Sequence, residues 1–157
     1  MNARARARPV GTKLRTRLLF AAAGVTIFAV LHHADHVIRG NHSGWPFQEA
    51  VTPFTFSLLI YALLLPGLYV SSRGRLMAGY WLFTAMVGLA LVVWVHFVPT
   101  ADYEAPMEDI YAVYGSALSG LLALVVLAGL VSGLVTLVVI AIWALRLRAS
   151  EKRSEPH

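Results

Sequence analysis

The stretch LMAGYWLFTAMVGLALVVWVHFV, from Leu76 to Val98, decides the fold because it contains no charged residue. A helix needs about 20 apolar residues to cross the hydrocarbon core of a bilayer, and this stretch supplies them. The whole chain of 157 residues is 58% hydrophobic and only 13% charged, with a mean hydropathy of +0.67. Soluble domains carry about 25% charged residues, so we expect an integral membrane protein in contact with the lipid bilayer.

Three further apolar runs accompany this one along the chain. The first run, Leu18 to Leu31, continues as a polar-tipped helix to Arg39, and turn-forming residues separate it from the next. Thr52 and Pro53 have the pattern of an N-cap followed by proline at the first helical position. The sequence therefore predicts an all-α, integral membrane four-helix bundle. The expected spans are 18–39, 53–70, 76–98 and 111–145, within a transmembrane domain of residues 18–145.

The positions of Lys and Arg predict the orientation of the bundle. Six precede the first run, two lie between the second and third runs, and four follow the fourth run, which accounts for 12 of the 13. Because basic loops stay in the cytoplasm, residues 1–17 and 146–157 are predicted to be basic cytoplasmic tails, with Arg39 as the single exception. We expect a multi-pass protein of the cell membrane with the N and C termini inside. The alternative for the first run is a cleaved signal peptide, which the continuation of the helical pattern through His36 disfavours.

Aromatic residues support these boundaries because Trp and Tyr gather at membrane interfaces. Those expected at the outer interface are Trp45, Phe47, Trp94 and Tyr103, and those expected at the inner interface are Tyr69, Tyr80, Trp81 and Trp143. The fourth run is too long for one untilted span, and a helix starting near Pro106 is expected to precede it. Its small residues pair at helical spacing, Ser116 with Gly120 and Gly129 with Gly133. These pairs favour close packing within the bundle, or else a homo-oligomer or a partner membrane subunit.

The segment LHHADHVIR, from Leu31 to Arg39, carries the chemistry of the sequence. At 100° per residue, His32, Asp35, His36 and Arg39 fall within an arc of about 100° on one helix face, with His33 near its edge. Polar side chains at this depth in a membrane are costly unless they face inward and find partners. His96 ends the third span at a similar depth and is expected to complete a site across the bundle.

These residues predict a metal site made of nitrogen and oxygen ligands. Histidines at i and i+4 can bind one ion from a single turn, and the absence of Cys excludes thiolate ligands. We expect His32, Asp35, His36 and His96 to bind a Zn, Fe or Cu ion, with His33, Glu104, Glu108 and Asp109 as secondary candidates. Asp35 could instead orient a ligand imidazole. In the alternative interpretation Asp35 and Arg39 neutralise each other, and the histidines are interfacial side chains.

Two resemblances bear on the cofactor. The box HHADH, residues 32–36, resembles the HxxxH boxes of membrane desaturases and hydroxylases, which implies a di-iron site. Those families have several boxes, whereas this chain has one box and His96. Four helices with histidines on separate spans also resemble small b-type cytochromes, which implies one haem held by His96 and either His32 or His36.

The function expected from the sequence is transition-metal binding at the extracytoplasmic side, for metal handling or redox chemistry. A haem b electron carrier and a non-catalytic accessory subunit are the alternatives, and enzyme and binding protein both stay open. No Walker loop, dinucleotide-binding GxGxxG, GxSxG or HExxH pattern is present. The pI near 10 arises from charges dispersed beside apolar runs, so no nucleic-acid partner is expected.

Overall fold

The computed structural model describes residues 3–39, 51–98 and 114–153, and every regular element within these ranges is helical. The elements are α1 (Ala3–Arg39), α2 (Pro53–Ser57), the 3-10 helix η1 (Leu58–Ile60), α3 (Tyr61–Ser72), α4 (Ala78–Phe97) and α6 (Ala117–Arg153). In these ranges four segments are long and apolar enough to cross a membrane: Gly11–Ile38, Pro53–Ser72, Ala78–Phe97 and Ala117–Glu151. The predicted all-α class is confirmed, and the four segments support a multi-pass membrane protein.

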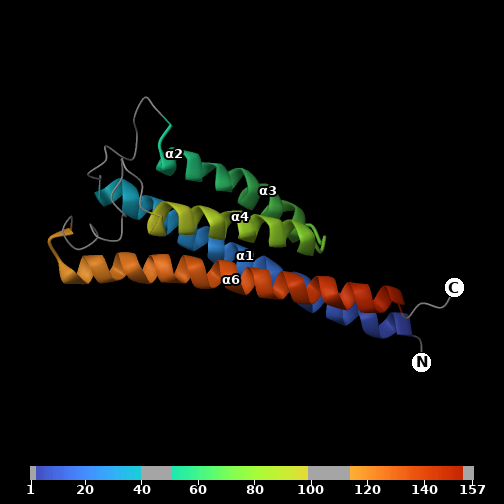
Figure 1. Ribbon diagram of the computed structural model, residues 1–157. Helices are drawn as coiled ribbons and strands as arrows, with labels where there is room; N and C mark the ends of the chain where they lie inside the picture. Colours follow the sequence, from blue (N-terminus) through green and yellow to red (C-terminus); the bar gives the residue numbers. More distant parts are fainter. Residues whose placement is uncertain (1–2, 40–50, 99–113, 154–157) are drawn as a thin grey trace.

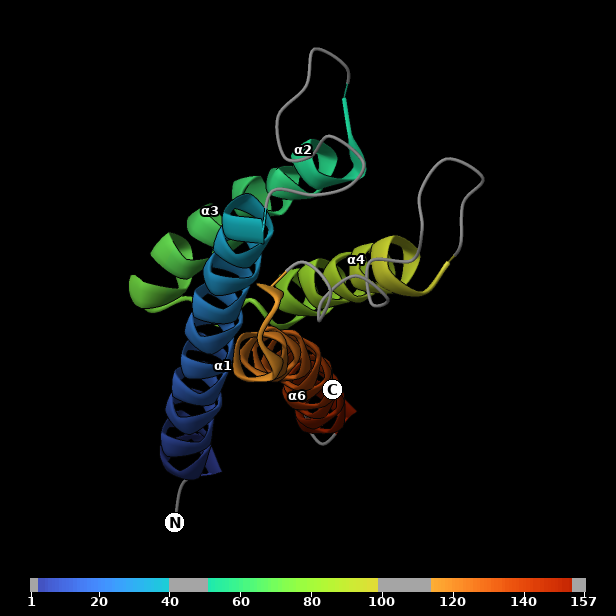
Figure 2. The same cartoon turned by 90° about the vertical axis from the view of Figure 1, so that its left-hand side faces the viewer.

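The two long helices, α1 and α6, form the centre of the bundle (Figure 1). They pack along each other over most of their length, with α3 lying mainly against α1 and α4 mainly against α6 (Figure 2). The start of α1 and the end of α6 lie together at one end, beyond the shorter α3 and α4. We call this the arginine end, defined by Arg15, Arg17 and Arg148. The opposite end, defined by His32, His36 and His96, is the histidine end.

Both long helices extend beyond the apolar runs that predict them. Helix α1 begins at Ala3 rather than Leu18, and α6 continues from Leu145 to Arg153. Alanine, arginine and leucine are strong helix formers and favour a helix in both basic segments, although the first segment also contains Pro9 and Gly11, which disfavour it. Leu14 and Leu18 are also 4% and 1% exposed in the core, which stabilises this extension. A helical extension therefore replaces much of each predicted tail.

The second span begins at the predicted cap. The Thr52 hydroxyl accepts from the backbone N–H of Thr55 at 3.1 Å, and the Thr55 hydroxyl accepts from the backbone N–H of Thr52 at 2.9 Å. This capping box, with Pro53 at the start of the helix, confirms the expected N-cap. It fixes the start of α2 beside α1, which determines where Phe54 and Ser57 contact the histidines.

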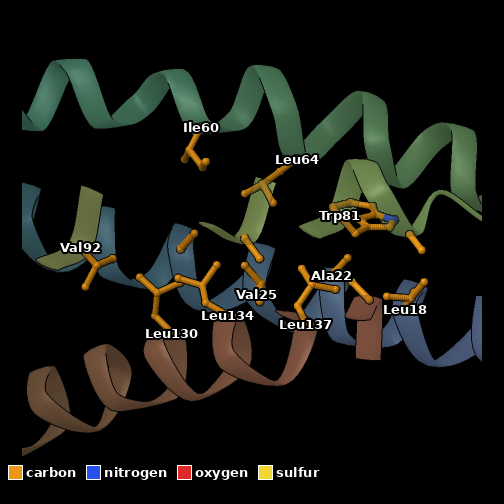
Figure 3. Packing of buried hydrophobic residues seen from close by; sticks show 14 of the residues in the cluster. Leu18, Ala22, Val25, Ile60, Leu64, Trp81, Val92, Leu130, Leu134 and Leu137 are labelled. Atoms are coloured by element: carbon orange, nitrogen blue, oxygen red, sulfur yellow. The ribbon is translucent and has the colours of Figure 1, made fainter. Parts of the chain in front are cut away.

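Glycines let α6 approach α1 closely. A Cβ atom at Gly129 would collide with the ring of Phe28, and one at Gly133 would lie 3.1 Å from Cγ2 of Val25. The small pair Gly129 and Gly133 therefore packs within the bundle, one of the two arrangements expected for it. Figure 3 shows Val25 packed against Leu130 and Leu134 of α6 in this core.

Two features differ from the sequence prediction. Trp81 is 0% exposed and donates from Nε1 to the Ser71 hydroxyl at 2.9 Å, so it belongs to the core and its expected place at the interface was wrong. Helix α6 begins at Ala117, after Gly115 with its φ of +55°, whereas the predicted span begins at Tyr111. The helix expected to start near Pro106 lies outside the described residues.

Candidate metal centre

Three histidines from two helices meet at the histidine end. His32 and His36 lie one turn apart on α1 and share a face because residues at i and i+4 stack along a helix. His96 lies in the last turn of α4. Their side chains are 6%, 4% and 4% exposed, so all three rings are inside the bundle. The expected encounter of His96 with the α1 histidines is present in the fold.

The three rings are close enough to share one ion. Nε2 of His36 lies 3.2 Å from Nε2 of His32, and one of these nitrogens donates to the other. The centroid of the His96 ring is 4.8 Å from that of His32 and 5.6 Å from that of His36. One ligand nitrogen from each residue lies within 4.8 Å of the other two. A tetrahedral zinc ion with bonds of 2.0–2.1 Å holds its nitrogens about 3.3 Å apart, which is close to the 3.2 Å between the His32 and His36 nitrogens.

A backbone carbonyl group determines which ring nitrogen of His96 is able to bind a metal ion. Its Nδ1 lies 3.0 Å from the carbonyl oxygen of Val92. A carbonyl oxygen only accepts, so Nδ1 carries the proton and donates. Nε2 is then the nitrogen with a lone pair, which is the form that binds a metal ion. The turn of α4 before His96 thus acts as the orienting partner of this ligand.

His33 is directed away from the other three rings although it adjoins His32 in the chain. Its Nδ1 lies 2.8 Å from the carbonyl oxygen of Ala29 and 2.9 Å from the hydroxyl of Tyr61, and its Nε2 lies 2.9 Å from the hydroxyl of Ser57. Both ring nitrogens are engaged, so His33 connects α1 to the second span. It is not one of the three clustered histidines. Its expected secondary role as a ligand has no support in this geometry.

The acidic candidates have different places. Asp35 is 9% exposed, and its Oδ1 accepts a hydrogen bond from the hydroxyl of Tyr114, which precedes α6. Among the described residues the clustered ligand atoms come from histidines alone, and the Asp35 carboxylate is not one of them. This hydrogen bond joins α1 to the segment before α6, and both roles expected for Asp35, ligand or orienting group, stay predictions. The other acidic candidates, Glu104, Glu108 and Asp109, lie outside the described residues.

A cavity of about 50 Å³ adjoins the three histidines and is lined by residues of all four spans. Beside the histidines its polar lining consists of Ser57, and the remaining described side chains that line it are apolar. Figure 3 shows Ile60 and Leu64 of the second span facing Leu130 and Leu134 across this part of the core. A polar cluster thus borders a small apolar chamber inside the bundle.

Sequence reasoning missed three residues that hold the site in place, namely Ser57, Tyr61 and Tyr114. Ser57 and Tyr61 lie one turn apart on the second span, in a run whose other hydroxyl-bearing residues are Thr55 and Tyr69. Hydroxyls at i and i+4 facing one side of a span are a signal for an interhelical hydrogen bond, which could have identified them. Tyr114 offered no comparable signal because its partner Asp35 is distant in the chain.

Fold and site together define a multi-pass helical membrane protein with a buried three-histidine cluster. A comparison with protein-family models gave no match, and comparisons with curated proteins and with solved structures gave none either. Its function therefore has to be argued from the chemistry of the site.

Proposed function

We propose that this protein binds one transition-metal ion through His32, His36 and His96 and uses it in metal handling or redox chemistry. The observation that carries the proposal is the convergence of three buried imidazoles from two helices to within 4.8 Å. Two of them come from one helical turn, and the third reaches the same point from the end of another span. A bundle core that only needed to pack would bring apolar side chains to this point.

The donor set limits the choice of ion. Neutral imidazoles suit Zn, Cu and Fe, whereas Mg and Ca prefer oxygen ligands. Three imidazoles bring no negative charge, so a divalent ion would keep its full charge in a medium of low dielectric constant. The buried carboxylate of Asp35 in the same turn of α1 supports the proposal because it supplies a nearby countercharge.

A haem is the other cofactor to which the histidines point. Two axial imidazoles have to stand on opposite faces of the macrocycle, which occupies the space between them. Here the rings of His32 and His96 lie 4.8 Å apart, the His36 ring touches both, and the adjoining cavity measures about 50 Å³. These dimensions favour an ion over a macrocycle.

The side of the membrane follows from the positive-inside rule. Arg15, Arg17 and Arg148 define the arginine end, and basic residues near span ends favour the cytoplasm. We infer that the protein resides in the cell membrane with the N and C termini inside and the metal site in the outer half. A reporter fused after His157 and active only outside the cytoplasm would contradict this orientation.

The test is elemental analysis with an absorption spectrum of detergent-purified protein. We expect the wild type to contain close to one transition-metal ion per chain and His32→Ala/His36→Ala to contain almost none at equal folded yield. His33→Ala is the matched control, because it removes an imidazole from the same turn whose nitrogens are engaged by Ser57, Tyr61 and Ala29. We expect it to keep the metal.

Two other outcomes would change the proposed function. A Soret band in the wild type that disappears in the double variant would replace the ion by haem. Equal metal content in the wild type and the double variant, after growth with added metal salts, would contradict the proposal and favour an accessory subunit. In that case the histidines would serve folding alone.

A further inference from the structure

The cavity beside the histidines limits which molecules could reach a metal ion bound there. His32, His36 and His96 form one wall of it, and the other lining residues come from α1, the second span, α4 and α6. Three protein ligands leave a tetrahedral ion one open position, which is the arrangement found in catalytic rather than structural zinc sites. An ion held by the three histidines would therefore have its open position at or beside this chamber.

The lining of the chamber supplies no charged group to a ligand. Val25, Ile60 and Leu64 border it together with Val92, Leu130 and Leu134 (Figure 3). Among the described residues that line it there is no Asp, Glu, Lys or Arg. The remaining polar groups of the lining, His33 and Ser57, are already hydrogen bonded to each other. An anion entering this space would lose its water, and the lining offers it no charged group, so its partner would be the metal ion itself.

The size of the chamber restricts the ligand further. Its volume is about 50 Å³. One water molecule needs about 10–15 Å³ by the same kind of measure, so the chamber admits a molecule of a few atoms. Apolar cavities in proteins stay dry and take up apolar guests such as xenon. A quinone, a sugar or an amino acid exceeds this volume.

We propose that the open position of the metal binds a small uncharged molecule of the diatomic-gas class, such as dioxygen or nitric oxide, through the apolar chamber. The proposal rests on the proposed metal site and goes beyond it by naming the class of ligand. Such gases dissolve better in hydrocarbon than in water, so a site within the spans meets a raised concentration of them. The chamber then selects by size.

Ala29 offers a way to fill the chamber without touching a ligand. It lines the cavity, is 3% exposed and lies on α1 within one turn of His32. Ala29→Leu adds apolar volume to the chamber and leaves all three histidines in place. Ala34→Leu is the matched control, since it makes the same change on the same helix at an exposed position outside the lining.

The experiment uses detergent-solubilised full chain loaded with Co²⁺, whose visible bands report coordination number at imidazole sites. Co²⁺ content is measured first, and nitric oxide is then titrated without oxygen. We expect nitric oxide to change the bands of the wild type and of Ala34→Leu alike. In Ala29→Leu, at unchanged Co²⁺ content, the concentration for half-saturation should rise at least about tenfold.

The outcomes separate this inference from the proposed function. A wild type that takes up no Co²⁺ contradicts the metal site itself. A wild type that holds Co²⁺ but ignores nitric oxide overturns the ligand assignment alone, as does equal nitric oxide binding in Ala29→Leu. If Ala29→Leu does not fold, Ala29→Val gives the same comparison with a smaller expected shift.

Discussion

The two ends of the bundle distribute polar and apolar side chains in opposite ways. At the arginine end the charged groups of Arg17 and Arg148 are exposed, while Leu14 and Leu18 fill the space between the helices. At the histidine end the order is reversed: His32 and His36 are buried, while Val37 and Ile38 of the same helix are 44% and 74% exposed. The first pattern suits a helix end in water, and the second suits a helix in lipid that keeps its polar groups inside.

This difference indicates that the polar residues at the two ends serve different purposes. Exposed arginines near span ends contribute to orientation and are individually worth little to stability. Buried imidazoles in a membrane are costly unless they are satisfied, so three of them gathered at one point favour a ligand. Substitutions at the two ends should therefore have effects of a different kind as well as of a different size.

The largest effect is expected from His96→Ala, which removes the proposed metal ligand on α4. We expect metal affinity to fall by about 100-fold or more, because two histidines from one turn seldom hold an ion alone. His96→Gln keeps much of the volume and should lose metal to a similar extent, which separates ligation from packing. Measurement is by competition with a metal indicator. If His96→Ala binds metal as tightly as the wild type, the two ends differ in burial only.

An intermediate effect is expected between the two ends, at the contact of α6 with α1. Gly129→Ala places a methyl group against the ring of Phe28 and should lower the free energy of unfolding by about 1–3 kcal/mol. Gly24→Ala on α1 meets nothing within 4 Å and should be neutral or stabilising by up to about 1 kcal/mol. Unfolding of both variants in detergent micelles can be followed by circular dichroism. Equal stability of the two variants would show that the close approach of these helices is absent.

The smallest effect is expected at the arginine end. The guanidinium of Arg17 lies 5.5 Å from the centre of the Trp143 ring, and both side chains are exposed. A double-mutant cycle of Arg17→Gln and Trp143→Leu should give a coupling of about 0.5 kcal/mol, typical of an exposed cation–π pair. Metal content should stay unchanged in all three variants. A loss of metal here would mean that the two ends are coupled and would break the comparison.

Much of the fold could be predicted because span formation is a local property. A stretch such as Leu76 to Val98 has enough apolar residues to form a helix in lipid whatever its neighbours are. The N-cap at Thr52 was equally predictable, since the capping box is formed by residues three apart in the chain. The extension of α1 to Ala3 was not, because Leu14 and Leu18 gain their burial from the rest of the bundle.

The candidate site was predictable in its members and not in its arrangement. Helical periodicity places His32 and His36 on one face, and span counting brings His96 to a similar depth. Periodicity placed His33 near the edge of that face, but it did not predict that the His33 ring contacts Ser57 while the His32 ring contacts His96. That distinction depends on which side of α1 the second span occupies. Trp81 was misplaced for the same reason, since depth alone does not tell a core tryptophan from an interfacial one.

The sequence by itself therefore determined that each of the four apolar runs forms a helix, and it determined which helix face carries the histidines. Both follow from the composition and the helical periodicity of a single segment. Only the tertiary structure decided which histidines meet, which nitrogen His96 presents and where the apolar chamber lies. These features depend on how α1, α4 and α6 pack around the second span, and the contacts involved join residues far apart in the chain. Packing in the bundle, rather than any single motif, turns a row of histidines into a candidate metal centre.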